Sequence, residues 1–247
     1  MAQSSPPTTA DDFTDAVTVR SRGRTVQSAI ALVIAVPLIV FAVPQLIADI
    51  VSARGNDVLT RLQNDETVSA EDLDTLIRAT ERARAWVDNG RSATDLGLAK
   101  ILAADRRNAM DAEARGEFEE AIAVLRDGLT KAPGNAYAWA RLAYAEARLD
   151  GFTPAALSAL RLALLTATNE PRLLWPRLSL SLRAWPHMTD TDRSIVANQI
   201  RIAWGENPEE LARLAVDGQQ ESVVRGALGR NRADIEKFDK LVNAAKS

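Results

Sequence analysis

Residues 116–133 read GEFEEAIAVLRDGLTKAP, and this stretch decides how the chain folds. Apolar side chains recur in it at three- and four-residue spacing, which is the period of a helix with one apolar face. Pro133 and Gly134 then provide a stop signal. The same period, with alanine, leucine, arginine and glutamate dominating, continues through the chain beyond Arg54. The sequence therefore predicts an all-α fold with short connections.

Capping and turn residues place the expected helices. Residues 69–72, SAED, form a variant of the capping box and open a helix that Asn89-Gly90 ends. Ser92 or Thr94 opens the next helix, which we expect to run to about Ala114. Further breaks are expected at Gly116, 133–134, 150–151, 169–171, 185–186 and 207–208. More polar helices are expected at about 208–216, 219–228 and 231–245.

The stretch 116–133 resembles the second helix of a tetratricopeptide repeat. The family pattern is filled in register by Gly116, Phe118, Ala121, Leu125, Gly128 and Pro133, although the family more often has Ala where Gly128 stands. Two later segments, beginning at Trp139 and Trp175, match the opening of the first helix of a repeat. These tryptophans are 36 residues apart, against a family period of about 34. The resemblance is strong over 116–143, fair to about 184 and faint elsewhere.

This resemblance implies an α-solenoid of antiparallel helix pairs that bury their apolar faces by stacking. We expect N-terminal helices of the repeat domain over 55–115, repeats over 116–206 and capping helices over 207–247.

Residues 25–48 contain no charged residue, and the centre of this stretch is almost wholly apolar. At about 1.5 Å per residue, it reaches about 36 Å as a helix, enough for a hydrocarbon core of about 30 Å. The sequence therefore predicts a single N-terminal transmembrane helix, which Pro37 and Pro44 are expected to bend. A cleaved signal sequence is the competing interpretation, but the apolar stretch is long and offers no good cleavage pattern near Ala48.

The flanking charges predict the orientation of this span. Arg20, Arg22 and Arg24 precede it, whereas Asp49 and a single arginine, Arg54, follow it. By the positive-inside rule the N-terminus is cytoplasmic, which in a bacterium places the rest of the chain in the periplasm, anchored to the inner membrane. Residues 1–24 are expected to form a disordered cytoplasmic tail.

Composition excludes much enzyme chemistry. The 247 residues include no cysteine and one histidine, so thiolate catalysis, cysteine-ligated metals and paired-histidine metal sites are excluded. A formal net charge of −3 argues against a nucleic-acid binder. No phosphate-binding loop, dinucleotide fingerprint or nucleophile elbow occurs. We expect a protein that is not an enzyme and has no cofactor and no bound metal.

Three remaining features have ordinary structural interpretations. His187 is expected to be a loop histidine with a local hydrogen bond. The acidic pairs 119–120 and 209–210 are expected to complement helix dipoles at helix starts. The five tryptophans are expected to pack into the core, with Trp185 as the best exception.

In tetratricopeptide arrays the first helix of each pair lines a concave groove. Carried over by register, this resemblance implies groove positions at Arg106, Met110, Glu113, Tyr137, Tyr144, Arg148 and Arg183. Arginines and tyrosines of this set would hold an acidic peptide, or one ending in a carboxylate, by charge-assisted hydrogen bonds.

The order of a single span, a short helical repeat domain and the runs 135–144 and 170–178 also resembles VpsP-like accessory proteins of bacterial exopolysaccharide biosynthesis. That resemblance implies a scaffold beside a polysaccharide assembly or export machine of the cell envelope. Two alternatives stay open: a glycan-binding or glycan-processing accessory protein, and a structural membrane protein that associates with itself as a homo-oligomer.

Overall fold

The computed structural model of the protein describes residues 12–64, 66–107, 111–229 and 231–246, with side chains from residue 32 onward. It confirms the all-α fold, since these ranges contain no strand. The helices, in chain order, are α1 (Asp12–Gln63), α2 (Ala70–Arg84), α3 (Gly90–Asp105), α4 (Ala112–Lys131), α5 (Ala136–Asp150), α6 (Pro154–Thr166), α7 (Pro171–Ala184), α8 (Asp190–Glu206), α9 (Pro208–Asp217), α10 (Glu221–Leu228) and α11 (Arg232–Ala245). A short 3-10 turn, Trp185–His187, joins α7 to α8.

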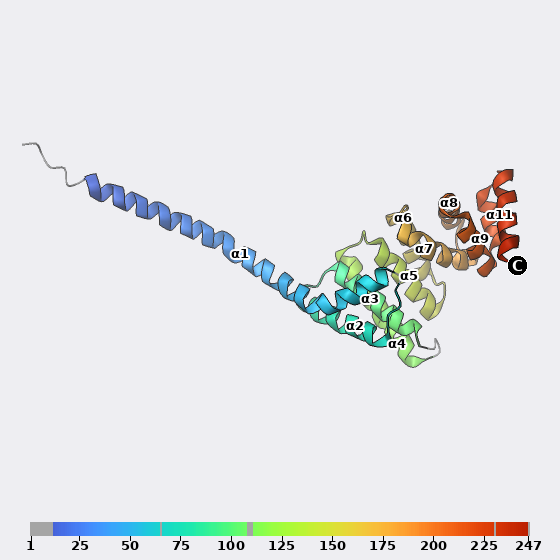
Figure 1. Cartoon of the computed structure of the whole chain (residues 1–247), viewed down its shortest axis with the longest axis horizontal. Coiled ribbons are helices and arrows are strands. Elements are labelled where there is room, and N and C mark those ends of the chain that lie inside the picture. Colours follow the sequence, from blue (N-terminus) through green and yellow to red (C-terminus); the bar gives the residue numbers. More distant parts are fainter. Residues whose placement is uncertain (1–11, 65, 108–110, 230, 247) are drawn as a thin grey trace, which may run out of the picture.

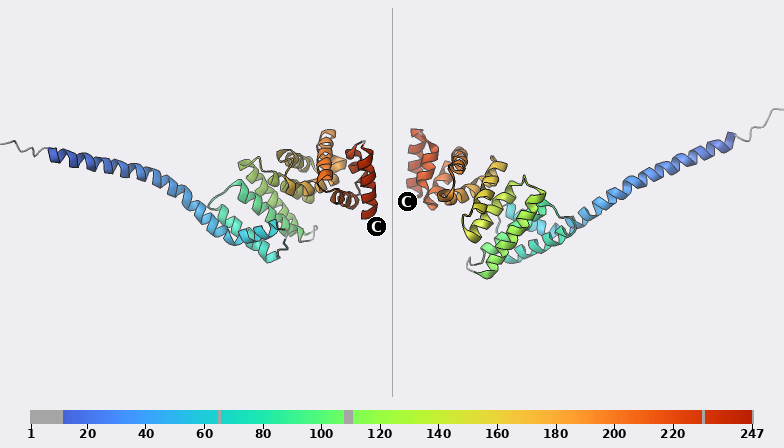
Figure 2. Two further views of the ribbon diagram at one scale, coloured as in Figure 1. Left: turned by 45° about the horizontal axis from the view of Figure 1, so that its top comes forward. Right: turned by 180° about the vertical axis from the view of Figure 1, so that it is seen from behind.

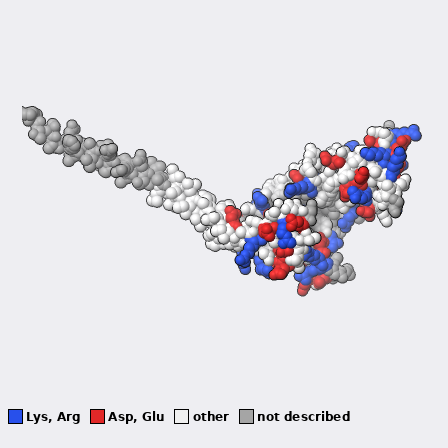
Figure 3. Space-filling model, in the orientation of Figure 1, with Lys and Arg blue, Asp and Glu red and all other residues white. Residues whose placement is uncertain are grey.

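Helix α1 is a long rod that leads into the helical domain, and the last helices form the opposite end of the molecule (Figure 1). It contains the one helical stretch in the described residues that is long and apolar enough to cross a membrane. Nearly all of its large apolar side chains from Leu32 to Ile50 are exposed. From residue 32 the visible side chains of α1 are uncharged until the helix reaches the domain, where acidic and basic side chains are mixed (Figure 3).

Helix α1 is longer at both ends than the expected span of 25–48. Residues 12–24, expected to belong to a disordered tail, are helical from Asp12 onward. The first residues of that tail lie outside the described residues. At its other end the helix continues to Gln63 without a break. Extending a formed helix needs no new nucleation, and only prolines strongly oppose it. Pro37 and Pro44 lie inside α1, which curves along its length (Figure 2).

The segment of α1 beyond the apolar stretch is part of the domain core. Val58 and Leu59 are buried in a small cluster with Leu73 and Leu76 of α2 and Ala99 of α3. A domain boundary at 55, as expected from the sequence, would therefore cut through an intact helix. The capping box that opens α2 is confirmed, because Ser69 and Asp72 exchange both hydrogen bonds.

The expected bounds of α3 and α4 were wrong. Asn89 accepts a hydrogen bond from the Ser92 backbone N–H and is the N-cap of α3, instead of belonging to a stop signal. Helix α3 ends at Asp105 and does not reach Ala114. The positions three and four residues after the buried Ala104 are Arg107 and Asn108, which do not continue the buried apolar face, and Asp111 caps the start of α4. Gly116 consequently lies inside α4 and breaks no helix.

Helices α3 to α8 pack as sequential pairs around one main core. Helices α3 and α4 pack closely at two points where a glycine of one helix meets a side chain of the other. A Cβ on Gly97 would lie 2.6 Å from Leu125 Cδ2, and one on Gly128 would lie 2.6 Å from Ala93 Cβ. This close approach explains why Gly128 stands where the repeat pattern more often has Ala. Helices α9, α10 and α11 follow, and Phe238 of α11 is buried in the same core.

Candidate functional site

The concave side of the helix pairs carries a groove, lined by α3, α5 and α7 together with the end of α1. It consists of two adjoining hollows of about 720 and 500 Å³. The groove comprises all residues that line either hollow, and the two hollows share Leu62, Leu98, Tyr137, Arg141, Arg172 and Pro176. Because α3, α5 and α7 are the first helices of successive pairs, the groove lies where a tetratricopeptide array has its inner face.

Tyr137 and Arg141 lie one turn apart on α5 and form the centre of the groove. The Tyr137 hydroxyl donates a 2.9 Å hydrogen bond to Glu170 Oε1 at the start of α7. The Arg141 guanidinium lies 5.9 Å from the centre of the Tyr137 ring. Burial, and then the hydrogen bond to Glu170, raise the pKa of Tyr137, so this phenol is neutral at pH 7.

Arg141 also holds α5 against α3. It donates a 2.7 Å hydrogen bond to the Thr94 carbonyl and lies 3.7 Å from Asp95 Oδ1. Burial raises the pKa of Asp95 and lowers that of Arg141, because each charged form is held partly away from water. Arg141 is therefore a structural cation whose charge is already shared with a carboxylate.

Asp105, the last residue of α3, accepts hydrogen bonds from two of the predicted groove residues. The Tyr144 hydroxyl donates to its Oδ2 at 2.7 Å, and Arg148 Nε donates to its Oδ1 at 3.1 Å. Burial and the hydrogen bond to Asp105 raise the pKa of Tyr144 to about 12. The Arg148 guanidinium lies 5.8 Å from the centre of the Phe118 ring, so this arginine joins α5 to both helices of the preceding pair.

The structure brings only some of the predicted groove residues together. Tyr137 and Tyr144 line the groove, with Arg148 beside Tyr144. Arg183 is exposed on α7, with its guanidinium 6.0 Å from the centre of the Phe152 ring. Met110 lies outside the described residues.

The placement of the first repeat unit was wrong, and the bounds of α3 explain why. Arg106 follows the end of α3 and donates a hydrogen bond to the Val68 carbonyl. Glu113 lies in the first turn of α4, the second helix of its pair, where it forms an ion pair with Arg107. Neither residue lines the groove. The family register assumed a continuous first helix where the chain has a loop.

Three arginines and one tryptophan line the groove but were not predicted from the sequence to do so. Arg91, Arg141, Arg172 and Trp175 all line its larger hollow. Arg91 and Arg172 are exposed, and the described residues place no carboxylate within 4.0 Å of either. Arg141 could have been predicted, because it lies one helical turn after Tyr137. Arg91 could not, because its place in the groove depends on the position of α3 relative to α5.

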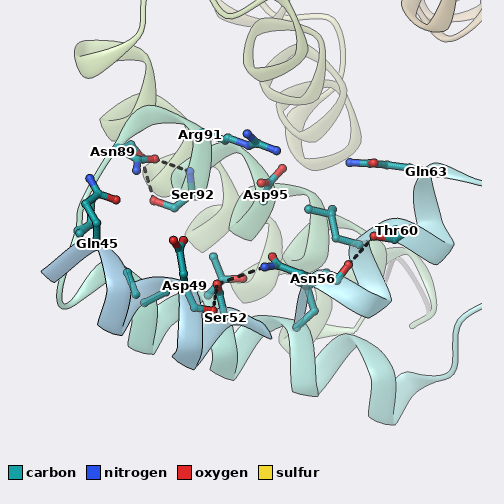
Figure 4. Close-up of a pocket in the computed structure, with 16 residues that line it drawn as sticks. Gln45, Asp49, Ser52, Asn56, Thr60, Gln63, Asn89, Arg91, Ser92 and Asp95 are labelled. Atoms are coloured by element: carbon teal, nitrogen blue, oxygen red, sulfur yellow. Dashed lines mark hydrogen bonds between the residues drawn. The ribbon is translucent and has the colours of Figure 1, made fainter. Parts of the chain in front are cut away.

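A third hollow, of about 430 Å³, continues from the groove along α1. It shares Gln63, Arg91 and Asp95 with the groove. One face of α1 carries a row of polar side chains, Gln45, Asp49, Ser52, Asn56, Thr60 and Gln63, that line this hollow. The row faces Asn89, Arg91, Ser92 and Asp95 of the opposite wall (Figure 4).

The described residues offer little that resembles a catalytic centre. They contain no group of three or more His, Cys, Asp or Glu side chains able to hold a metal ion. His187 stacks on Phe152 with ring centres 5.8 Å apart, in place of the expected local hydrogen bond. Glu120 lies within α4, away from a helix start, and binds Lys100 at 2.7 Å. Glu210 pairs with Arg213 in the first turn of α9.

The tryptophans divide into two groups. Trp139, Trp175 and Trp204 are partly buried and pack against the main core, as expected, and Trp185, named as the best exception, packs there too. Trp86 does not, because 52% of it is exposed just beyond the end of α2. The expectation of a core position was therefore wrong for Trp86.

Comparison with known proteins supports the repeat assignment and nothing narrower. The tetratricopeptide repeat family model matches residues 109–146, which include α4 and most of α5. No curated protein and no solved structure matches the chain. The resemblance to VpsP-like proteins therefore receives no support from these comparisons. The chain is all-α, packs its helices in sequential pairs and carries a tetratricopeptide repeat at residues 109–146.

Proposed function

We propose that the protein is a membrane-anchored scaffold that holds a protein partner in the groove between α3, α5 and α7. The observation that carries this proposal is the concave face itself, which combines half-buried aromatic rings and exposed prolines with arginines that have no carboxylate within 4.0 Å among the described residues. Repeats of the tetratricopeptide family commonly serve protein–protein interaction, and such repeats present extended concave binding surfaces. Scaffolding needs no catalytic residue.

The chemistry of the groove suggests an acidic partner segment. Arg91 and Arg172 are exposed at its rim with no carboxylate within 4.0 Å among the described residues. Tyr137 and Trp175 offer flat apolar surface between them. A peptide with a carboxylate, at its C-terminus or on a side chain, would pair with these guanidinium groups by charge-assisted hydrogen bonds. Confinement of both proteins to one membrane would raise their effective concentration, so modest contacts suffice.

Helix α1 supplies the anchor in this proposal. A signal sequence passes the same test of length and apolarity, but α1 continues without a break through Ala48, where cleavage would have to occur. Ala48 is itself buried against the domain. We propose the inner membrane of a bacterium as the location, with the N-terminus cytoplasmic and the domain periplasmic, on the strength of the flanking arginines.

Crosslinking in native membranes tests the scaffold. We expect the wild-type chain to capture other proteins and Arg172→Glu to lose most of that capture, because a carboxylate would repel an acidic segment. Lys240→Glu is the matched control, since Lys240 is an exposed cation of α11 outside the groove. Unchanged capture by Arg172→Glu would contradict the groove. Arg148 is a poorer test, because its reversal would also break the pair with Asp105.

The same experiment separates the alternatives. Capture of copies of this chain alone would indicate a self-associating structural protein. Oligosaccharide binding by the full chain in detergent would indicate a glycan-binding protein. The identities of the captured proteins would test the place beside a polysaccharide assembly or export machine, which rests on the resemblance to VpsP-like proteins.

A further inference from the structure

The exposed Trp86 lies at the end of the domain nearest to the apolar stretch of α1. Outside α1, the described residues expose only three large hydrophobic side chains: Trp86, Leu162 and Leu165. Both leucines belong to α6. Trp86 is different because it belongs to the loop between α2 and α3, residues 85–89.

Contacts between α1 and α2 show where this loop lies along α1. Arg61 Nη1 lies 3.2 Å from Asp72 Oδ2 near the start of α2. Further back along α1, a Cβ on Gly55 would lie 3.0 Å from Ala79 Cβ in the second half of α2. The two helices are therefore antiparallel, and each step forward along α2 is a step back along α1.

The antiparallel alignment of α1 and α2 places the loop 85–89 beside the end of the apolar stretch. Val87 and Asn89 line the hollow that Gln45 and Ala48 also line. The close-up shows Asn89 on the wall nearest to Gln45 (Figure 4). Trp86 therefore lies level with the last turn of the residues 25–48 that carry no charge. If that stretch crosses a bilayer, the loop is at the height of the lipid headgroups.

The side chains around Trp86 suit such a position. Tryptophan is enriched at the boundary between membrane and water, where its ring meets apolar groups and its N–H meets polar ones. Arg82 lies one turn before Trp86, is exposed, and has no carboxylate within 4.0 Å among the described residues. Its guanidinium group is free to pair with lipid phosphates.

The carboxylate of the loop belongs to a cluster without net charge, in which Arg84 and Lys131 each bind both Asp88 and Asp127. Asp88 accepts hydrogen bonds from Arg84 Nη2 at 2.8 Å and from Lys131 Nζ at 2.5 Å. Both bonds favour the charged carboxylate and lower the pKa of Asp88. A paired carboxylate loses less on leaving water than a lone one, so Asp88 presents little obstacle to contact with lipid.

We propose that the loop 85–89 is a second, interfacial membrane contact, in which Trp86 lies among the lipid headgroups beside the end of α1. This proposal rests on the proposed anchor and adds to it. A span alone does not set its own tilt and rotation in the bilayer, and a second contact fixes both for the span and for the domain joined to it. The groove then keeps one orientation toward the bilayer, which suits a partner that is also bound to the membrane.

The cysteine-free chain allows a direct test with single labels. Ala85→Cys, Ala70→Cys and Phe41→Cys would each carry one nitroxide in the full-length protein, reconstituted in vesicles of phosphatidylethanolamine and phosphatidylglycerol. Ala70 and Ala85 are exposed alanines at opposite ends of α2, so they form a matched pair. Phe41 is exposed on the apolar stretch and reports whether α1 is in the bilayer.

The readout is collision with oxygen, which concentrates in lipid, against collision with a water-soluble nickel chelate. We expect the label at 41 to favour oxygen, the label at 70 to favour nickel, and the label at 85 to be several-fold less accessible to nickel than the label at 70. Adding Trp86→Ser to Ala85→Cys should restore nickel access, whereas Trp86→Tyr, which keeps an interfacial ring, should not.

The outcomes separate the two proposals. Equal nickel access at 70 and 85, with the label at 41 in lipid, would overturn the interfacial contact and leave the anchor intact. A label at 41 that favours nickel would overturn the anchor and the interfacial contact together. A protected label at 85 that Trp86→Ser leaves unchanged would overturn the role of Trp86.

Discussion

At the scale of single residues, Gly128 and Gly116 show how the same residue type in one helix can have opposite consequences. Both lie in α4. A Cβ on Gly128 would lie 2.6 Å from Ala93 Cβ, whereas a Cβ on Gly116 would meet nothing within 4 Å. We expect Gly128→Ala to lower the free energy of unfolding by about 1–3 kcal/mol, because α3 and α4 must move apart. Gly116→Ala should raise it by about 0.5–1 kcal/mol through better helix propensity. Urea unfolding followed by circular dichroism measures both, and a stabilising Gly128→Ala would contradict the close packing of these helices.

Tyr144 gives a prediction of pH dependence. Its pKa is raised from 10.0 to about 12, by burial and by the hydrogen bond to Asp105. The folded state therefore holds the phenol proton more tightly than the unfolded state. The resulting stabilisation is complete below pH 10 and is lost as the pH rises toward 12. The chain has two tyrosines, so Tyr137→Phe leaves Tyr144 as the only phenol for a titration by ultraviolet absorbance. Adding Asp105→Asn should lower its pKa, and an unchanged titration would contradict the role of Asp105.

At the scale of helices, Arg177 joins α6 to α7 from a buried position. Only 1% of it is exposed, and its Nη1 donates to the carbonyls of Ala163 and Ala167 at the end of α6. The last carbonyls of a helix have no partner inside the helix, and a cation there also complements the helix dipole. We expect Arg177→Leu to lower the free energy of unfolding by about 2–4 kcal/mol and to speed hydrogen exchange at the end of α6. Arg213→Leu on the surface of α9 is the control, because an exposed ion pair contributes about 0–1 kcal/mol. A loss no larger than that of the control would contradict this role.

The helices also show what sequence alone could predict. Apolar periodicity and strong breaks, such as Pro133-Gly134, predicted the all-α fold and placed α5 and α7 correctly enough to bring Tyr137 and Tyr144 to the groove. The end of α3 at Asp105 was missed, because a helix-forming sequence continues beyond it and the cap at Asp111 was not recognised. Because of that error, Arg106 and Glu113 were wrongly assigned to the groove. Arg91 and Arg172 could not be predicted, because they meet only when α3 and α7 are placed beside α5.

At the scale of the whole molecule, α1 joins the apolar stretch and the first layer of the domain in one continuous helix. By composition these are two parts, because charged residues reappear at Asp49. The backbone nevertheless forms one helix across them. The packing of Val58 and Leu59 against α2 then ties the direction of the apolar stretch to that of the repeats. The groove consequently has a defined orientation relative to α1, which is what the proposed scaffold at a membrane surface would need.

Two truncations test this coupling. A chain beginning at residue 49 loses the apolar stretch but keeps Val58 and Leu59, which are only 4% and 8% exposed. A chain beginning at residue 64 loses both side chains and uncovers Leu73 and Leu76 of α2. Burial of two such side chains stabilises a fold by about 3–6 kcal/mol, so we expect the shorter chain to be less stable by about that amount. Hydrogen exchange should show α2 protected in the chain from 49 and unprotected in the chain from 64, with α5 to α8 protected in both. Equal protection of α2 in the two chains would show that the end of α1 is a passive connector and not part of the domain.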